Sequence, residues 1–352
     1  MKQLRHSLLL TALLALLTSC EVEFSPNAEW RETPVVYCLL DQDDDTSYVR
    51  IQRCFMGTDN QQQYTTIADS NYYPADALQV FIEEWACRQA SNGSYVRSGS
   101  APKRIFQFDY KLLTHKDDGE FYSAAQPVYC CATGGLLDTA SLYRLRVVKN
   151  NATHDTLLSA ETNLISGDMR LLRPNNLNKF KFTGSNANKS CEFNWTSISQ
   201  ARQYQPIVRF FYRDFIIDRS SLPWDTTITP HSIDIVGPTV KSSMTEASLT
   251  TRMDENYYFS AIQKALIGDS CNKNSLDTVE VFITCCSEPL AAYLYAENPS
   301  SVINQEPFTY TNIEGGLGIF GARRTHISFR VATPSSSVDA YVKALKALNV
   351  GF

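Results

Sequence analysis

The chain has 352 residues and a formal net charge of −5 at pH 7, and 43% of its residues are hydrophobic. This hydrophobic content is typical of a globular protein and excludes general disorder, and the length predicts two domains rather than one. An acidic chain without clusters of basic residues is a poor match for nucleic acid, so we expect no nucleic-acid partner.

The first residues form an export signal. Lys2 and Arg5 precede a run of mostly Leu and Ala at 7–17, which is about half of the ~20 residues that a helix needs to cross a bilayer. The run ends in Leu-Thr-Ser before Cys20, which resembles the bacterial lipobox, where the Cys thiol takes a diacylglycerol. We therefore predict a signal peptide at 1–19 and a membrane partner reached through lipid on Cys20. An ordinary secretory signal that happens to end in Cys is the alternative.

The residues after Cys20 indicate where the mature protein lies. Glu21 and Glu23 resemble the acidic surface-export signal of Bacteroidetes lipoproteins. We therefore expect an outer-membrane protein that is exposed at the cell surface, with a periplasm-facing protein as the alternative. Residues 20–33 are polar and are predicted to form a lipidated tether. No second long apolar segment follows, which predicts an anchored rather than a spanning protein.

Residues 34–167 are predicted to form an N-terminal β-sandwich domain. Apolar residues alternate at 49–52, 78–83 and 143–147, which is the period of strands that bury one face. Clusters of turn-forming residues separate these segments, and no long helical pattern interrupts them. Many short strands with turns between them are typical of a β-sandwich.

A polar stretch at 166–190 predicts a domain boundary near residue 170, with a second β-rich domain at 175–352. Residues 193–195 and 204–212 resemble the B and C strands of fibronectin type III modules, in which a Trp fills the space between two sheets. The predicted fold class is therefore mostly β, with two sandwich domains of the immunoglobulin or fibronectin type III kind.

The second domain is predicted to carry added helices. Asp254 is suited to cap a helix that ends at Gly268. Residues 287–297 are predicted to form a short helix, and residues 338–348 an amphipathic helix that packs on a sheet. The buried face of the first of these helices is predicted to carry Tyr258, Phe259, Ile262, Ala265 and Leu266.

Three phrases stand out along the chain: PVVYCLLDQDDDTSYVRIQRCFMG at 34–57, YRLRVV and DTLLSAETNLI within 143–165, and PFTYTNIEGGLGIFGARRT at 307–325. Together with the lipobox they resemble a family of uncharacterised Bacteroidetes outer-membrane lipoproteins. The resemblance covers most of the mature chain and departs at Cys38 and Cys54, where a small or apolar residue other than Cys is expected. It implies a surface or periplasmic lipoprotein and carries no catalytic residue over to this chain.

A glycine motif resembles a nucleotide site. Gly316, Gly318 and Gly321 fit the G-x-G-x-x-G pattern, whose glycines lead from a strand into a helix that faces a pyrophosphate. Here the following segment is predicted to be a strand, and too few residues remain for a nucleotide-binding half. We therefore interpret the glycines as a bend between two strands.

An acidic segment resembles a calcium loop. Asp41, Asp43 and Asp45 fit its first, third and fifth positions, but Thr46 and Gln52 stand where Gly and Glu are required. We therefore expect a solvated hairpin turn, with a weaker calcium site completed by a distant carboxylate as the alternative.

Nine cysteines remain once Cys20 is lipidated, and an odd number leaves at least one thiol unpaired. The exported compartment permits disulfides, and Cys271 with Cys285 or Cys286 is the favoured pair. Neighbours on a strand point to opposite faces, so one member of each adjacent pair, 130–131 and 285–286, is expected in the core and the other exposed. The scattered Cys and His predict no metal site.

The remaining candidates are acidic and aromatic. Glu83 and Glu84 are expected to face water rather than to form an acid–base pair. Trp195 is expected in the core. Tyr72 and Tyr73 are expected to pack within a loop, and an exposed aromatic site for a sugar or a protein is the alternative.

No catalytic motif and no cofactor motif is present, so we expect no enzyme activity and no cofactor. The leading hypothesis is a non-catalytic lipoprotein that acts in binding or assembly, with a TonB-dependent transporter, another surface protein or a glycan as its partner. One alternative is a glycan-acting hydrolase with two carboxyl groups in a cleft between the domains. Another is a fimbrial structural subunit, which requires an exposed edge strand that can pair with its neighbour.

Overall fold

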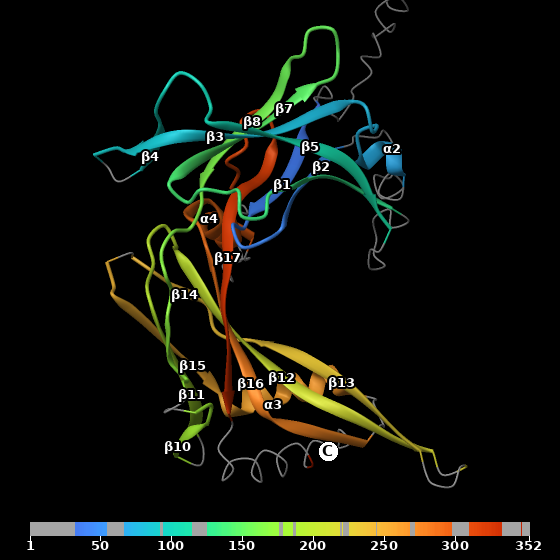
Figure 1. Ribbon diagram of the computed structural model, residues 1–352, viewed down its shortest axis with the longest axis vertical. Coiled ribbons are helices and arrows are strands. Elements are labelled where there is room, and N and C mark those ends of the chain that lie inside the picture. The colour runs from blue at the N-terminus through green and yellow to red at the C-terminus, as the bar shows by residue number, and fades with distance from the viewer. Residues whose placement is uncertain are drawn as a thin grey trace, which may run out of the picture.

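The chain is mostly β, as predicted, and its strands build two lobes along one spine (Figure 1). Within the described part of the chain the strands form a 13-stranded sheet and a 4-stranded sheet. The computed structural model describes residues 32–54, 67–91, 94–114, 125–175, 179–185, 188–218, 220, 225–243, 245–267, 272–297, 310–332 and 346.

The upper lobe of Figure 1 contains the strands from the N-terminal half of the chain. The alternation predicted at 49–52, 78–83 and 143–147 lies within strands, as expected. The first half of β5 pairs with β3 and its second half with β6, so the sheet folds over at this strand. The elements are β1 (Pro34–Leu40), β2 (Thr46–Arg53), α2 (Ala68–Asn71), β3 (Leu78–Gln89), β4 (Tyr95–Arg97), β5 (Arg104–Leu113), β6 (Gln126–Ala132), β7 (Ser141–Lys149) and β8 (Thr156–Asn163).

The lower lobe has two sheets that pack against each other. Trp195 of the small sheet is fully buried, as predicted, and its ring lies 5.9 Å from that of Tyr204 in the large sheet. The small sheet contains β9 (Leu171–Arg173), β10 (Thr183–Ser185), β11 (Asn188–Thr196) and β15 (Ser248–Asp254). The large sheet continues here through β12 (Gln203–Asp218), β13 (Asp225–Val236), β14 (Val240–Lys241), β16 (Asn272–Cys286) and β17 (Leu317–Ala332).

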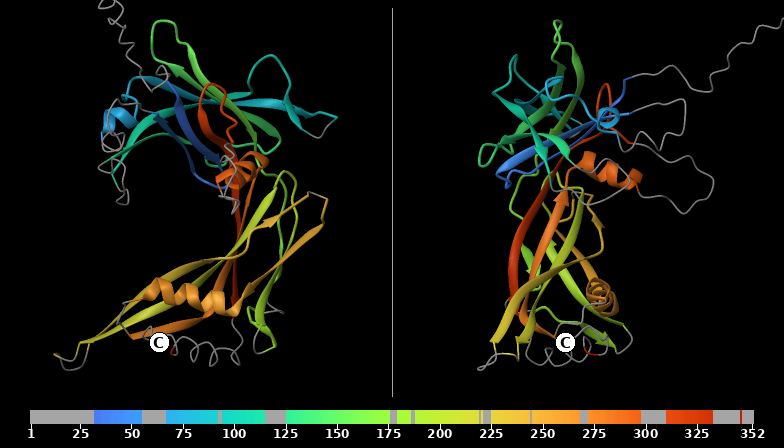
Figure 2. Two further views of the ribbon diagram at one scale, coloured as in Figure 1. Left: turned by 180° about the vertical axis from the view of Figure 1, so that it is seen from behind. Right: turned by 90° about the vertical axis from the view of Figure 1, so that its right-hand side faces the viewer.

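Two of the three predicted helices lie in the described residues. Helix α3 (Glu255–Leu266) begins at Asp254, whose carboxylate accepts hydrogen bonds from two backbone N–H groups of the first turn, as predicted. It buries the predicted face except Ala265, which is exposed. Helix α4 (Glu288–Glu297) is the predicted short helix. Figure 2 shows α3 across the lower lobe and α4 at the junction of the lobes. The predicted helix at 338–348 lies outside the described residues except for position 346, which is helical.

One strand belongs to both lobes. The first part of β17, from Leu317 to Ala322, pairs in parallel with β1, and the rest pairs antiparallel with β16. Gly318 has φ +103°, and a Cβ there would clash with the carbonyl oxygen of Val36. The strand predicted after the glycine motif is therefore confirmed. The predicted bend lies at Gly316, just before the strand, whereas Gly318 and Gly321 lie inside the strand. Gly318 allows β1 to approach, and Gly321 lies against Ser287 and Leu290 at the start of α4.

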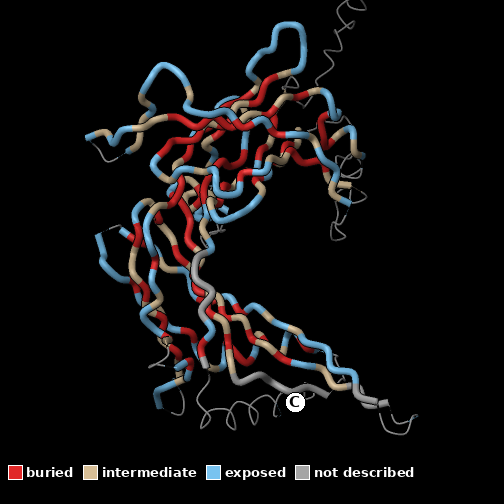
Figure 3. The backbone as a smooth tube through the Cα atoms, in the orientation of Figure 1, coloured by how far each residue is buried: buried red, intermediate tan, exposed pale blue. Residues whose placement is uncertain are grey.

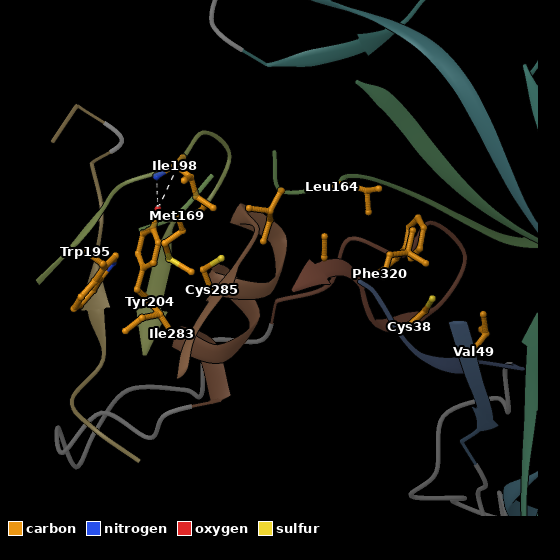
Figure 4. Close-up of a cluster of buried hydrophobic side chains, with 14 of the residues drawn as sticks. Cys38, Val49, Leu164, Met169, Trp195, Ile198, Tyr204, Ile283, Cys285 and Phe320 are labelled. Atoms are coloured by element: carbon orange, nitrogen blue, oxygen red, sulfur yellow. Dashed lines mark hydrogen bonds between the residues drawn. The ribbon is translucent and has the colours of Figure 1, made fainter. Parts of the chain in front are cut away.

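The hydrophobic core runs through both lobes without a break. Figure 4 shows part of it, from Trp195 and Tyr204 in the lower lobe through Phe320 to Cys38 and Val49 in the upper lobe. The buried segments follow the spine of the molecule from one lobe to the other (Figure 3). The lobes are therefore joined by apolar packing and by a shared strand, and not only by the connecting chain.

Candidate functional site

The acidic turn between β1 and β2 is a hairpin turn, as predicted, but its first carboxylate is buried rather than solvated. Asp41 is 3% exposed and accepts hydrogen bonds from the backbone N–H of Asp43 at 3.0 Å and of Thr325 at 3.3 Å. Thr325 lies in the part of β17 that pairs with the lower lobe. Burial raises the pKa of the Asp41 carboxyl above its usual value. This carboxylate thus ties a turn of one lobe to a strand of the other.

Two further side chains complete this connection. The Arg324 guanidinium donates to the Asp43 carboxylate at 2.9 Å and to the Gly167 carbonyl oxygen at 2.6 Å. The Gln42 amide donates to the carbonyl oxygen of Ile165 at 2.7 Å. We call Asp41, Gln42, Asp43 and Arg324 the clamp. The described residues contain no group of three or more His, Cys, Asp or Glu placed to hold a metal ion.

The expectation that Glu83 and Glu84 face water is wrong, since they are 5% and 3% exposed. Glu83 accepts hydrogen bonds from Trp85 Nε1 at 3.0 Å and from Arg146 Nε at 2.7 Å. Glu84 accepts one from Ser141 at 2.9 Å, and Lys103 Nζ lies 3.0 Å from it. Partners on neighbouring strands therefore offset the cost of burying both charges.

Every cysteine among the described residues is a free thiol, including Cys285 and Cys286, and Cys271 lies outside those residues. The expectation of one core and one exposed member in each adjacent pair is wrong. Cys285 and Cys286 are both buried, because the lobe core covers one face of β16 and Leu290 of α4 covers the other. Burial raises the pKa of both thiols to about 12, which keeps them protonated and unreactive. Residues 130–131 are both half-buried.

The predicted loop packing of Tyr72 and Tyr73 is confirmed, since their rings are 5% and 9% exposed. They therefore offer no exposed aromatic surface to a sugar or a protein.

Cys20, the predicted lipidation site, lies outside the described residues. Within the described residues, no helix has the length and apolar character needed to cross a membrane.

A cleft of about 410 Å³ opens where the two lobes meet. Its upper wall comes from β4, β7 and β8, and its lower wall comes from the turn before β12 and from α4. It is lined by Ser94, Tyr95, Leu142, Glu161, Thr162, Asn163, Gln200, Arg202, Ser287, Glu288, Pro289, Ala292 and Tyr310. A volume in this range and a mixture of apolar and polar side chains are typical of sites for small molecules.

The charged groups of the cleft are paired. Glu161 lies 2.6 Å from the guanidinium of Arg97, and Arg202 lies 3.1 Å from the carboxylate of Glu288. The paired groups give the cleft no excess of either sign. Tyr310 lies beside them, and burial, followed by the charge of Glu288, raises the pKa of its phenol.

Gln200 is the unusual residue of the cleft. Its backbone has φ +69°, which L-residues other than Asn and Asp rarely adopt. Its side-chain oxygen is buried and has no hydrogen-bond partner among the described residues. An unpaired buried acceptor costs on the order of 1–3 kcal/mol. Sparsely populated backbone conformations of residues other than glycine cluster at functional sites.

The turn that carries Gln200 is fixed by Tyr204. The Tyr204 hydroxyl accepts a hydrogen bond from the Ile198 N–H at 2.9 Å and donates to the Ile198 carbonyl oxygen at 3.3 Å (Figure 4). On the other side, the Arg202 N–H donates to the carbonyl oxygen of Cys286 at 2.9 Å. No local motif in the sequence marks Gln200, Arg202 or Tyr310, so the sequence alone does not indicate a site at these residues.

Comparisons with known proteins give no assignment. No family model matches the chain, and no curated protein matches it. Among solved structures, the chain is similar to Spo0M, a sporulation control protein from Bacillus subtilis, with 12% identity and a TM-score of 0.16. The match covers 53% of this chain and 56% of that chain, and it carries no argument about fold or function.

Proposed function

We propose that this protein is a non-catalytic, lipid-anchored binding protein of the outer membrane that holds a ligand in the cleft between its lobes. The observation that carries the proposal is the cleft itself, whose walls come from both lobes and include Gln200 with its left-handed backbone. The clamp fixes the lobes across the junction, so the cleft is formed before a ligand arrives. Preorganised sites bind more tightly because less entropy is lost on binding.

The anchor in this proposal is lipid on Cys20, with residues 20–33 as the tether to β1. A tether of this length can extend by at most about 45–50 Å. It would place the upper lobe nearest the membrane and leave the cleft in aqueous surroundings. The proposed location is the cell surface.

The same proposal includes two sandwich domains of the fibronectin type III kind, at 34–167 and 175–352. It is supported by a tyrosine in each lobe whose hydroxyl bonds back to the preceding loop, as in the tyrosine corner of such folds. Tyr143 accepts from the Asp138 N–H at 2.7 Å, and Tyr204 forms the equivalent contact with Ile198. In this arrangement the first part of β17, a strand of the second domain, pairs with β1 of the first domain.

The alternative classes have less support. A glycan-acting hydrolase needs a carboxylic acid and a carboxylate that are free to act, and both carboxylates of the cleft are engaged by arginines. A fimbrial subunit needs an edge strand that can pair with a neighbour. The edge strand β13 carries Pro230 and Asp234, which limit such pairing.

The cleft can be tested by filling it. The full-length protein in detergent would be screened by thermal shift against uncharged and charged oligosaccharides, short peptides and nucleosides. We expect at least one compound to raise the melting temperature of the wild type and to leave that of Ala292→Trp unchanged, because the indole would occupy the cleft. The matched control is Ala132→Trp on the exposed end of β6, which should respond like the wild type. A screen without any stabilising compound would contradict the proposal.

The anchor has its own test. Wild-type protein should incorporate labelled palmitate and fractionate with membranes, and Cys20→Ala should do neither. A Cys20→Ala variant that still incorporates the label would show that the lipid is attached elsewhere.

A further inference from the structure

A second, smaller pocket lies in the lower lobe, away from the cleft. Figure 1 shows β10 at the end of this lobe that is far from the junction, and a pocket of about 100 Å³ opens beside it. The pocket shares no residue with the cleft and is lined by Arg173, Pro174, Lys179, Lys181, Thr183, Cys191 and Glu192. Sites that enclose a whole small molecule have volumes of about 300–1,000 Å³, so this pocket has room only for a single chemical group.

The pocket lies where two short strands leave a gap beside β11. β9 pairs with β11 at Asn194 and Trp195, and β10 pairs with it from Asn188 to Ser190. β15 occupies the opposite side of β11 over its whole upper part. Among the described strands, none pairs with residues 191–193 on the side of β9 and β10. Side chains from β9, from β10 and from the segment before β10 therefore surround this gap.

Lys179 and Lys181 are fixed at the mouth of the pocket by the aromatic residues next to them. Phe180 is fully buried and Phe182 is half-buried, and their rings lie 5.5 Å and 5.3 Å from the ring of Tyr258 in the lobe core. Both lysines are exposed, so their side chains point away from this core. The packing of the two phenylalanines holds the lysine backbone in place before any ligand binds, which lowers the entropy lost on binding.

The lining of the pocket has more positive than negative charge. It contains three cations and one carboxylate, which leaves an excess of two positive charges. Both oxygens of Glu192 already have partners, since Arg173 lies 2.9 Å from one and Arg252 lies 3.2 Å from the other. Lys179 and Lys181 have no ion pair with any residue that the structure describes. Their charges are therefore open to an anion.

The sequence does not show this cluster directly. Residues 169–191 contain five basic residues and no acidic one, in a chain that is acidic as a whole. The five are spread over the segment, so no dense basic motif appears. The fold brings Arg173 of β9 to the same pocket as Lys179 and Lys181. The positive charge is thus gathered by the pairing of β9 and β10 with one strand.

From this pocket we propose a second binding site in the lower lobe, which takes a phosphate group that is either free or carried by a larger molecule. A phosphate dianion balances the excess of two positive charges, whereas a carboxylate would leave one cation without a counter-charge. Arginine and lysine are the usual donors to phosphate oxygens, and Thr183 adds a hydroxyl group. The small volume holds the phosphate group and leaves the rest of any carrier in solvent.

Calorimetry on the full-length protein in detergent tests this site at about pH 8, where phosphate groups are dianions. The probes are inorganic phosphate and glucose 6-phosphate, and glucose and acetate are the controls. We expect both phosphates to bind, and to bind more weakly as the NaCl concentration rises. Tighter binding of glucose 6-phosphate than of inorganic phosphate would identify a carried phosphate as the ligand, and the opposite order would identify the free anion. Acetate or glucose that binds as tightly as the phosphates would overturn the proposal.

Substitutions of the charged residues locate the contact. Lys179→Gln/Lys181→Gln should reduce the affinity for phosphate about tenfold, because two partly exposed charge pairs are lost. Glu192→Gln should instead increase the affinity, because it removes the carboxylate that competes for the arginines. The matched control is Lys111→Gln/Lys264→Gln, which makes the same change in net charge at two exposed lysines outside the pocket and should leave the affinity unchanged.

The result for this site is independent of the result for the cleft. Ala292→Trp fills the cleft and should bind phosphate as the wild type does, since Ala292 does not line this pocket. An equal loss of affinity in the two double lysine variants would show that phosphate responds only to net charge, which would overturn the proposal. Absence of binding by both phosphates would also overturn it.

Discussion

The two sides of the lobe junction differ in how their polar residues connect the lobes. On the clamp side the acidic side chains have partners in both lobes, and Arg324 alone bonds to a turn and to the chain that links the lobes. On the cleft side Gln200 combines a left-handed backbone with an acceptor that has no partner among the described residues. Gln42 of the clamp also has a buried side-chain oxygen without a hydrogen-bond partner among the described residues, so an unpaired acceptor does not by itself distinguish the two sides. Gln200 is distinguished by its left-handed backbone and by its place in the lining of the cleft.

The largest loss of stability is expected for a substitution in the hydrophobic core that the two lobes share. Phe320 is fully buried in β17 between the lobes, and Phe320→Ala should lower the free energy of unfolding by about 3–5 kcal/mol. Denaturant unfolding would measure this change. The exposed Ile105 on β5 provides the control, since Ile105→Ala should change stability by less than about 0.5 kcal/mol. An equal loss in both variants would show that the junction core is not continuous.

The second-largest loss of stability is expected for a substitution in the clamp. Arg324→Ala removes a largely buried guanidinium that pairs with the exposed Asp43 and donates to Gly167, which should cost about 1–3 kcal/mol in unfolding free energy. Its neighbour Arg323 is half-exposed and lies 3.6 Å from the exposed Asp44, so Arg323→Ala should cost less than about 1 kcal/mol. Comparable losses for the two arginines would argue against a clamp that depends on burial.

A substitution at Gln200 in the cleft should raise the free energy of unfolding, whereas the substitutions above lower it. Gln200→Gly relieves a backbone conformation that costs an L-residue about 1–2 kcal/mol, and it removes a buried unpaired acceptor. Glycine also adds entropy to the unfolded chain, so the net gain should be about 0.5–1 kcal/mol by denaturant unfolding. A loss of stability in this variant would show that the turn needs the glutamine side chain for structure.

The smallest effect is a pH dependence at the clamp. Burial raises the pKa of Asp41 in the folded state above its usual 3.8, so the folded protein binds this proton more readily than the unfolded chain. Wild type should therefore gain stability relative to Asp41→Asn as pH falls through the raised value towards 3.8, and lose that gain as pH rises. Unfolding at a series of pH values measures the difference. Asp45→Asn, at an exposed position of the same turn, should show no such trend.

Local signals predicted local structure well. Asp254 and the apolar face after it identified α3, the acidic segment identified a hairpin, and Trp195 identified the core of the lower lobe. Each of these depends on residues within a few positions or on one large apolar side chain. The coarse mostly-β class followed from the period-two alternation.

Features that depend on distant partners were missed. Glu83 and Glu84 were expected to face water because their partners are distant in the sequence: Arg146 lies on β7 and Lys103 lies just before β5. Cys286 is buried only because α4 folds over the second face of β16. Gln200 lies in no sequence motif. Only its positive φ angle and its position in the lining of the cleft distinguish it. No periodicity in a single sequence could have revealed these contacts.

The pairing of β1 with the first part of β17 has a consequence for how the chain is made. These strands are separated by nearly the whole length of the described sequence, so β1 cannot complete its pairing until β17 has been synthesised. Closing so long a loop is entropically costly and slow. The N-terminal lobe therefore cannot finish folding ahead of the rest during synthesis, and the edge of β1 that β17 covers stays unpaired until β17 has been made.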